Sequence, residues 1–160
     1  MSGFSNPIQD MPEDIHVTLW DRLCELIRRG DFAATEEIYD ELTHIPGRVG
    51  QCIKDHKPEL TLEVGAGEWD WNGYLANYDS MHPTYQPWID GTGGSKASLS
   101  PADFSIIILA KTLALPVVSM EIPCGNQPGT KSRKIPDVCL AETVGHMTFN
   151  DLLRAEGLKL

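Results

Sequence analysis

The sequence lacks the features that identify several large classes of protein. No apolar run approaches the length of a membrane span, and the first residues do not form a basic, apolar leader. No P-loop, GxGxxG or GxSxG motif is present, so nothing marks an NTPase, a dinucleotide-binding enzyme or a serine hydrolase. These absences predict a soluble, cytoplasmic protein without membrane partners, whose chemistry depends on another set of residues.

Cysteine is also scarce, and none of the four cysteines belongs to a CxxC pair. Cys52 and His56 lie one helical turn apart, which is half of a zinc site, but no second half with ligand spacing follows. Ordinary reduced thiols are therefore the better interpretation.

Basic residues are outnumbered, with 13 Lys and Arg against 23 Asp and Glu and a net charge of -10. This excess disfavours broad, non-specific binding to nucleic acids, because carboxylates and phosphates repel one another. It is also expected of a protein that gathers carboxylates around a cation. The 160 residues suit one domain with a real core, so we expect a single domain over 1–160 with an irregular segment over 1–16.

A strongly apolar segment over 100–121 organises the rest of the chain. A serine cap and a proline predict a helix that runs to Leu113 and carries Asp103 in its first turn. Residues 117–120 then predict a short, buried parallel strand that ends on Glu121. In open α/β sheets ligands bind beyond the carboxyl ends of strands, so the two acids are expected to converge on one crevice.

The flanking pattern predicts further elements, each by its apolar spacing or its breakers. They are a helix from Val17 to Gly30, a helix over 35–45, a polar helix over 48–57, a short strand over 60–64, an irregular segment over 80–99, a helix from Ile135, a strand over 144–149 and a closing helix.

Several polar and aromatic residues are candidate site residues. Glu41 borders the buried stripe of its helix, where a half-buried acid needs a partner or a cation; a surface glutamate is the alternative. Asp137 suits either a helix cap or a site. Trp69 and Trp71 lie on different helical faces, so one of them is expected at the surface, where it could stack on a base. The alternative is that both tryptophans pack under a loop.

A basic segment follows Glu121 in this otherwise acidic chain. It places three basic residues within four positions, which favours contact with phosphates, although a solvated loop is the alternative. The three candidates for RNA binding are Lys131, Arg133 and Lys134.

Five short motifs, in this order, resemble the PIN-domain nucleases, and within them a bacterial group of uncharacterised PIN-like proteins. The motifs are Leu-Trp-Asp-Arg-Leu (19–23), Ile-Tyr-Asp-Glu-Leu (38–42), Ala-Asp-Phe-Ser-Ile (102–106), Val-Val-Ser-Met-Glu (117–121) and Lys-Ile-Pro-Asp-Val-Cys (134–139).

This resemblance implies a three-layer α/β domain with a central parallel sheet flanked by helices. It further implies a metal-dependent ribonuclease, the toxin of a toxin–antitoxin pair, with RNA as substrate, an antitoxin protein as partner and a homodimer as a further possibility. Glu41, Asp103 and Glu121 would hold Mg²⁺ or Mn²⁺, with Asp137 as a fourth or a structural residue. Hard cations of this kind prefer oxygen ligands.

The resemblance is incomplete at the N-terminal end. PIN domains begin with an apolar strand that ends on a metal-binding aspartate, and here that strand is missing or degenerate, with Phe4 at the acid's position and Asp10 as a substitute that nothing positions. Glu121 also replaces the more usual aspartate. The alternative function is therefore a catalytically weakened PIN-like domain that binds protein or RNA.

Overall fold

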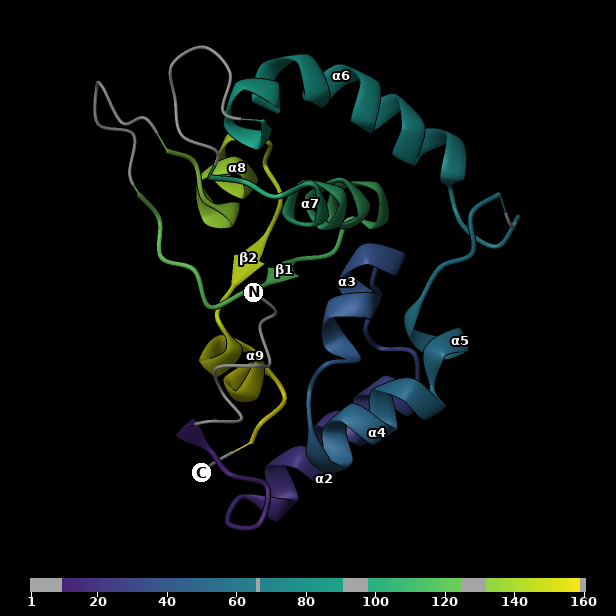
Figure 1. The fold of residues 1–160 in the computed structure, drawn as a ribbon, viewed down its shortest axis with the longest axis vertical. Helices are drawn as coiled ribbons and strands as arrows, with labels where there is room; N and C mark the ends of the chain where they lie inside the picture. Colours follow the sequence, from purple (N-terminus) through teal and green to yellow (C-terminus); the bar gives the residue numbers. More distant parts are fainter. Residues whose placement is uncertain (1–9, 66, 91–97, 125–131, 159–160) are drawn as a thin grey trace. The chain divides into compact units, whose positions relative to one another are not determined.

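The structure, a computed structural model, describes residues 10–65, 67–90, 98–124 and 132–158 (Figure 1). Helices take 59% of the described residues and strands 4%. The elements are α2 (Val17–Arg28), α3 (Glu36–Leu42), α4 (Gly47–Asp55), α5 (Lys57–Leu60), α6 (Trp71–Ile89), α7 (Pro101–Leu113), β1 (Val117–Val118), α8 (Ile135–Ala141), β2 (His146–Met147) and α9 (Phe149–Ala155).

The predicted three-layer α/β fold with a central parallel sheet is wrong. In the described part of the chain, the only sheet has two strands, β1 and β2, which pair in parallel with Val117 opposite His146. Residues 60–64, predicted as a strand, contribute one bridge, between Ala34 and Thr61, directly after α5. A short apolar run is compatible with a buried helix as well as with a buried strand. The local pattern could therefore not exclude a mostly helical fold.

The chain divides into two compact units. The first consists of Met1–Glu63 together with Thr148–Leu160, and the second of Val64–Met147.

In the first unit, α2 buries the apolar face that its spacing predicted. Gly30 follows this helix with a φ of +71°, a left-handed conformation that glycine adopts without strain, and α2 ends there as expected. Trp20 is 1% exposed and stacks on Phe149 at the start of α9, with 6.0 Å between the ring centroids. The C-terminal helix therefore completes the core of the N-terminal unit.

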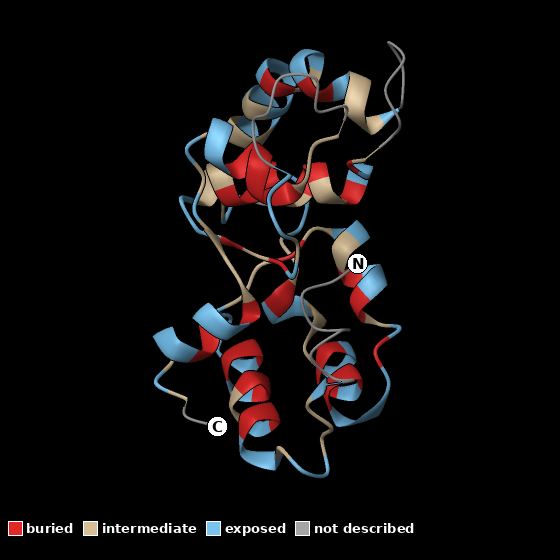
Figure 2. Cartoon of the chain, turned by 90° about the vertical axis from the view of Figure 1, so that its left-hand side faces the viewer, coloured by how far each residue is buried: buried red, intermediate tan, exposed pale blue. Residues whose placement is uncertain are grey.

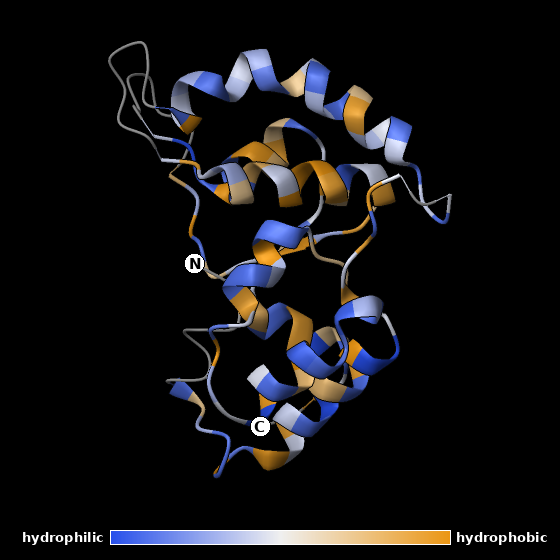
Figure 3. Cartoon of the chain, turned by 45° about the vertical axis from the view of Figure 1, so that its right-hand side comes forward, coloured by the Kyte–Doolittle hydropathy of each residue, from blue (hydrophilic) through white to orange (hydrophobic). Residues whose placement is uncertain are grey.

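In the second unit, α7 forms the centre of the core. Ile107 and Ile108 are fully buried, and most of the helix is buried and apolar in Figures 2 and 3. A serine cap and Asp103 begin this helix as predicted. Its N-terminal end and the C-terminal end of β1 lie on the same side of the unit, because the chain reverses direction between α7 and β1 (Figure 1).

The prediction that residues 80–99 are irregular is wrong for the first ten of them, because α6 continues to Ile89. Pro83 and Pro87 lie inside this helix, and each removes one backbone hydrogen bond. Met81 and Tyr85 are buried in the core around α7, so tertiary packing compensates for that loss. Residues 91–97 lie outside the described part of the chain.

Within the described ranges, no helix has both the length and the apolar character needed to cross a membrane.

Candidate functional site

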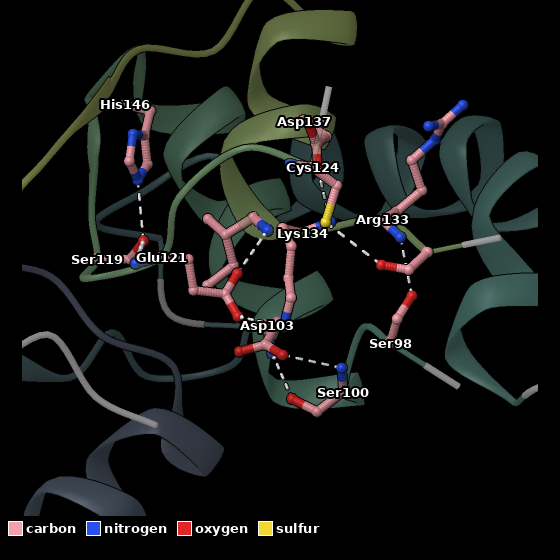
Figure 4. Close-up of polar contacts among 12 residues, drawn as sticks. Ser98, Ser100, Asp103, Ser119, Glu121, Cys124, Arg133, Lys134, Asp137 and His146 are labelled. Carbon is pink, nitrogen blue, oxygen red and sulfur yellow. Dashed lines mark hydrogen bonds and ion pairs between the residues drawn. The ribbon is translucent and has the colours of Figure 1, made fainter. Parts of the chain in front are cut away.

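Glu121 lies just beyond β1, where the strand ends. Ser119, which is 2% exposed, shares a hydrogen bond of 2.9 Å with His146 Nε2, and its Oγ accepts the N–H of Glu121 at 3.2 Å. The Glu121 carboxylate accepts the N–H of Ile135 at 2.8 Å and pairs with Lys134 Nζ at 3.3 Å (Figure 4). The strand end is thereby tied to the start of α8.

Asp137 ties the same two segments together from inside α8. It is 7% exposed, and its carboxylate accepts the N–H of Lys134 at 3.0 Å and of Cys124 at 3.1 Å. These contacts favour helix capping, the first of the two roles considered for Asp137 from the sequence.

Asp103 occupies the first turn of α7. Its carboxylate accepts the N–H of Ser100 at 2.9 Å, and the Ser100 hydroxyl accepts the N–H of Asp103 at 3.0 Å. This reciprocal capping box explains why the helix starts where it does. Asp103 remains partly exposed, so it is not sealed inside the core.

One hydrogen bond joins the starts of α7 and α8. Arg133, the residue before Lys134, donates its N–H to Ser98 Oγ at 2.9 Å (Figure 4). Ser98 lies two residues before Ser100, the cap of α7. The start of α7, the end of β1 and the start of α8 therefore converge. We call Asp103, Glu121, Lys134 and Asp137 the strand-end cluster; it combines three carboxylates with one ammonium group.

The predicted RNA-binding residues separate in the structure. Lys134 belongs to the strand-end cluster, whereas the Arg133 guanidinium lies over the Trp88 ring of α6, 5.1 Å from its centroid. Arg133 Nη1 is buried and has no hydrogen-bond partner in the part of the chain that the structure describes. Lys131 lies outside the described residues.

Glu41 lies on α3 in the first unit, whereas the strand-end cluster belongs to the second. Glu41 is exposed, as expected for the surface glutamate and not for the half-buried acid considered from the sequence. The helix begins as predicted, because Thr35 Oγ accepts the N–H of Ile38 at 3.5 Å. The role of Glu41 as a metal ligand stays a prediction.

No group of three or more His, Cys, Asp or Glu that could hold a metal ion occurs among the described residues. The three acids of the strand-end cluster do not form such a group, and neither do Cys52 and His56. All four cysteines are free, and burial raises the pKa of the Cys139 thiol to about 12.

A second polar network was missed from the sequence. Glu142, after α8, accepts hydrogen bonds from Lys111 of α7 at 2.6 Å and from the Tyr85 hydroxyl of α6 at 2.7 Å. Burial alone would raise the pKa of Glu142, but these two hydrogen bonds outweigh it and lower that pKa. Burial, and then the bond to Glu142, raise the pKa of Tyr85. No spacing in the sequence links three residues so far apart, just as none links Ser119 to His146.

A family model described as a domain of unknown function (DUF4411) matches residues 8–160. The comparison with curated proteins found no match, and neither did the comparison with solved structures.

Proposed function

We propose, from the premise that this chain belongs to the DUF4411 family, that it is a metal-dependent ribonuclease that hydrolyses RNA phosphodiester bonds in the cytoplasm. The resemblance of its motifs to PIN-domain nucleases supports this chemistry and suggests the toxin of a toxin–antitoxin pair. The proposal depends on the strand-end cluster of the second unit.

The observation that carries the proposal is the convergence of Asp103, Glu121 and Lys134 on the starts of α7 and α8. Cleavage of a phosphodiester needs oxygen ligands for a hard cation and a positive group for the phosphate. Carboxylates from two different elements supply the first, and Lys134 supplies the second. All three side chains are at least partly exposed, so a substrate can reach them.

The donor set fits a cation that keeps most of its water. Mg²⁺ is usually bound through one or two carboxylates plus waters and phosphate oxygens, so a three-residue protein cage is not required. Asp103 and Glu121 would hold the cation, which supplies an activated water and neutralises charge on the phosphate. Lys134 now compensates the charge of Glu121, and it would contact the phosphate. Asp137 positions the segment after β1.

A binding module that does not cleave is the second candidate. The specific observation in its favour is that each acid of the cluster already accepts a hydrogen bond within the protein: Asp103 from Ser100, Glu121 from Ile135 and Asp137 from Cys124. In that case the cluster is structural, and Lys134 and its neighbours bind RNA without a cation.

The test combines thermal melts in millimolar MnCl₂ with cleavage of a labelled single-stranded RNA. A ligand that binds only the folded state stabilises it by mass action, and each 1 kcal/mol raises Tm by roughly 2–4 °C at this chain length. We expect a Mn²⁺-dependent rise in Tm and RNA cleavage, both lost in Glu121→Gln and Asp103→Asn.

Asp79→Asn is the matched control, because Asp79 is an exposed acid of the same unit that lies on α6. It should keep both the rise in Tm and the cleavage. RNA binding without any effect of Mn²⁺ would discard the ribonuclease and leave the binding module. An equal rise in Tm in all variants would place the cation elsewhere on the protein.

A further inference from the structure

The start of α6 carries a chain of aromatic side chains. The Trp69 and Trp71 rings meet edge to face with their centroids 5.5 Å apart, and Tyr74 stacks on Trp71 at 5.3 Å. One turn later the Tyr78 ring stacks on His82 at 5.0 Å. Such pairs fix the side chains in place, so this half of the helix presents a preformed surface.

Helix α6 has two apolar stripes. Met81 and Tyr85 are buried in the core, and Tyr74 packs against it from the same side. Trp71, Leu75 and Tyr78, spaced four and then three residues apart, form a second stripe that borders the core side of the helix. At this border the Tyr78 ring also meets buried Phe104 edge to face, with the centroids 5.8 Å apart. Leu75 is 42% exposed and Tyr78 is 38% exposed. Figure 3 shows the result, with apolar and polar residues interleaved along α6. We call Trp71, Leu75 and Tyr78 the outer stripe.

Acidic residues surround the outer stripe. Glu68 and Asp70 precede the helix, Asp79 lies one turn after Leu75, and all three are exposed. Between Pro58 and Ser95 the sequence contains six Asp and Glu and no Lys or Arg. The surface is therefore apolar at its centre and negatively charged at its margin. Its charge is opposite in sign to that of the basic segment near Lys134.

We propose that the outer stripe is the docking surface for a second protein, specifically for an amphipathic helical segment with Lys or Arg beside apolar side chains. Apolar side chains spaced along such a segment pack on Leu75 and Tyr78, as in other helix-in-groove complexes. Its cationic side chains pair with Glu68, Asp70 and Asp79, and the exposed part of the Trp rings adds cation–π attraction. This proposal does not depend on the ribonuclease.

The charges argue against the other two occupants. RNA is bound through its phosphates, which three carboxylates repel and no basic residue of this stretch attracts. A second copy of this chain, docked through the same face, would set Asp70 and Asp79 against acids of the same kind. A basic partner is the occupant that the surface complements.

The test uses the full chain and a designed peptide of Leu and Lys at helical spacing, with binding measured by titration calorimetry. We expect Leu75→Ser with Tyr78→Ser to weaken binding at least tenfold, since centrally placed apolar contacts dominate such interfaces. Asp79→Asn should weaken it less and flatten its dependence on salt. A peptide with Glu in place of Lys should not bind.

Leu140→Ser is the matched control, because Leu140 is 74% exposed in the same unit but lies on α8. It should leave the Kd unchanged, as should Glu121→Gln. Tyr78 also contacts buried Phe104, so Leu75→Ser alone, which replaces a side chain that is 42% exposed, is measured beside the double variant and should weaken binding in the same direction. An unchanged Tm of the single variant checks that it folds. Equal binding by the double variant, or an equal loss in Leu140→Ser, would overturn the proposal, as would tight binding of the Glu peptide or of a single-stranded RNA at this surface.

Discussion

At the scale of single residues, Glu121 shows how one carboxylate can serve both structure and chemistry. It accepts a backbone N–H from Ile135 and an ammonium from Lys134, and both partners belong to the start of α8. The ammonium pair is only partly buried, with 39% of the Lys134 side chain exposed. Pairs of this kind contribute about 0–1 kcal/mol, so Lys134 is bound loosely enough to be replaced.

This weakness leads to a prediction for Lys134→Met. Removing the ammonium takes away the cation that competes for Glu121, so the variant should bind Mn²⁺ more tightly and show a larger Mn²⁺-dependent rise in Tm than the wild type. Its affinity for single-stranded RNA should fall, because a phosphate contact is lost. Thermal melts and fluorescence anisotropy measure the two effects.

Lys54→Met provides the comparison, since Lys54 is an exposed lysine on α4 in the first unit. Neither property should change there. A smaller Mn²⁺ effect in Lys134→Met than in the wild type would mean that Lys134 supports the cation site and does not compete with it.

At the scale of elements, one partly buried polar network joins three helices of the second unit. Tyr85 comes from α6, Lys111 from α7, and Glu142 follows α8 directly. Helix packing is fixed mainly by apolar burial, which has no direction, whereas hydrogen bonds of 2.6 and 2.7 Å require one orientation of the helices. The network therefore sets the register of α6 and α8 on α7.

The lowered pKa of Glu142 gives a pH prediction. A carboxyl group whose pKa is lower in the folded than in the unfolded state stabilises the fold above its ordinary value, 4.5, and loses that contribution as the pH falls through the folded value. Glu142→Gln should be less stable than the wild type at pH 7, by about 1–3 kcal/mol. The difference should shrink as the pH is lowered below 4.5.

Urea titrations at several pH values measure this difference. Glu37→Gln, at an exposed position in the first turn of α3, should show a much smaller one. A gap between wild type and Glu142→Gln that persists unchanged in acid would show that Glu142 acts through packing and not through its charge.

At the scale of the whole molecule, the order of the chain does not match the order of its units. Residues from Thr148 onward return to the unit formed by the N-terminal segment. Phe149 is 1% exposed against Trp20, and Glu156 pairs with Arg22 at 3.3 Å. The first unit is therefore incomplete until the last helix has been made.

Phe149→Ala tests this arrangement. The variant should lose about 3–5 kcal/mol of stability, because it leaves a cavity beside Trp20. Hydrogen exchange should rise in α2 and α4 and change little in α7, which belongs to the other unit. Leu140→Ala, on an exposed site, should cost less than about 0.5 kcal/mol. Equal loss of protection in both units would show that they unfold together.

Much of the local structure could be predicted from the sequence, because its signals are local. The face of α2, its end at Gly30 and the cap of α7 follow from spacing, caps and breakers. The strand after α7 does pair in parallel, but it has two residues and one partner, where a strand over 117–120 in a central sheet was predicted. The number of strands could not be predicted, since apolar runs do not specify their partners. The length of α6 was missed because Pro83 and Pro87 predict the end of a helix. The burial of Met81 and Tyr85 stabilises the helix across these prolines, and the sequence does not show that burial.

The candidate site, too, could be predicted only where its signals are local. Asp103 and Glu121 could be placed at the same side of the second unit by the direction of α7 and β1 alone. The partners of Glu121 could not be predicted, because Lys134 and Ile135 reach it through the path of the chain after the strand. The bond from Cys124 to Asp137 depends on the same path. For Glu41 the helical wheel left a half-buried acid and a surface glutamate open, because a wheel does not tell how closely the neighbouring segments cover its edge; the structure shows the exposed side chain.

The parallel pairing of β1 with β2 has a kinetic consequence. Val117 and His146 are far apart in the sequence, so the chain loses loop entropy before this short ladder forms. Its flanking bonds run from Val117 N–H to Gly145 O at 2.8 Å and from Ser119 N–H to Met147 O at 3.1 Å. Helices α7 and α8 have local bonds and should form before it in folding. We therefore expect Glu121, which follows this ladder, to meet Lys134 and Ile135 only after the local caps made by Asp103 and Asp137 have formed.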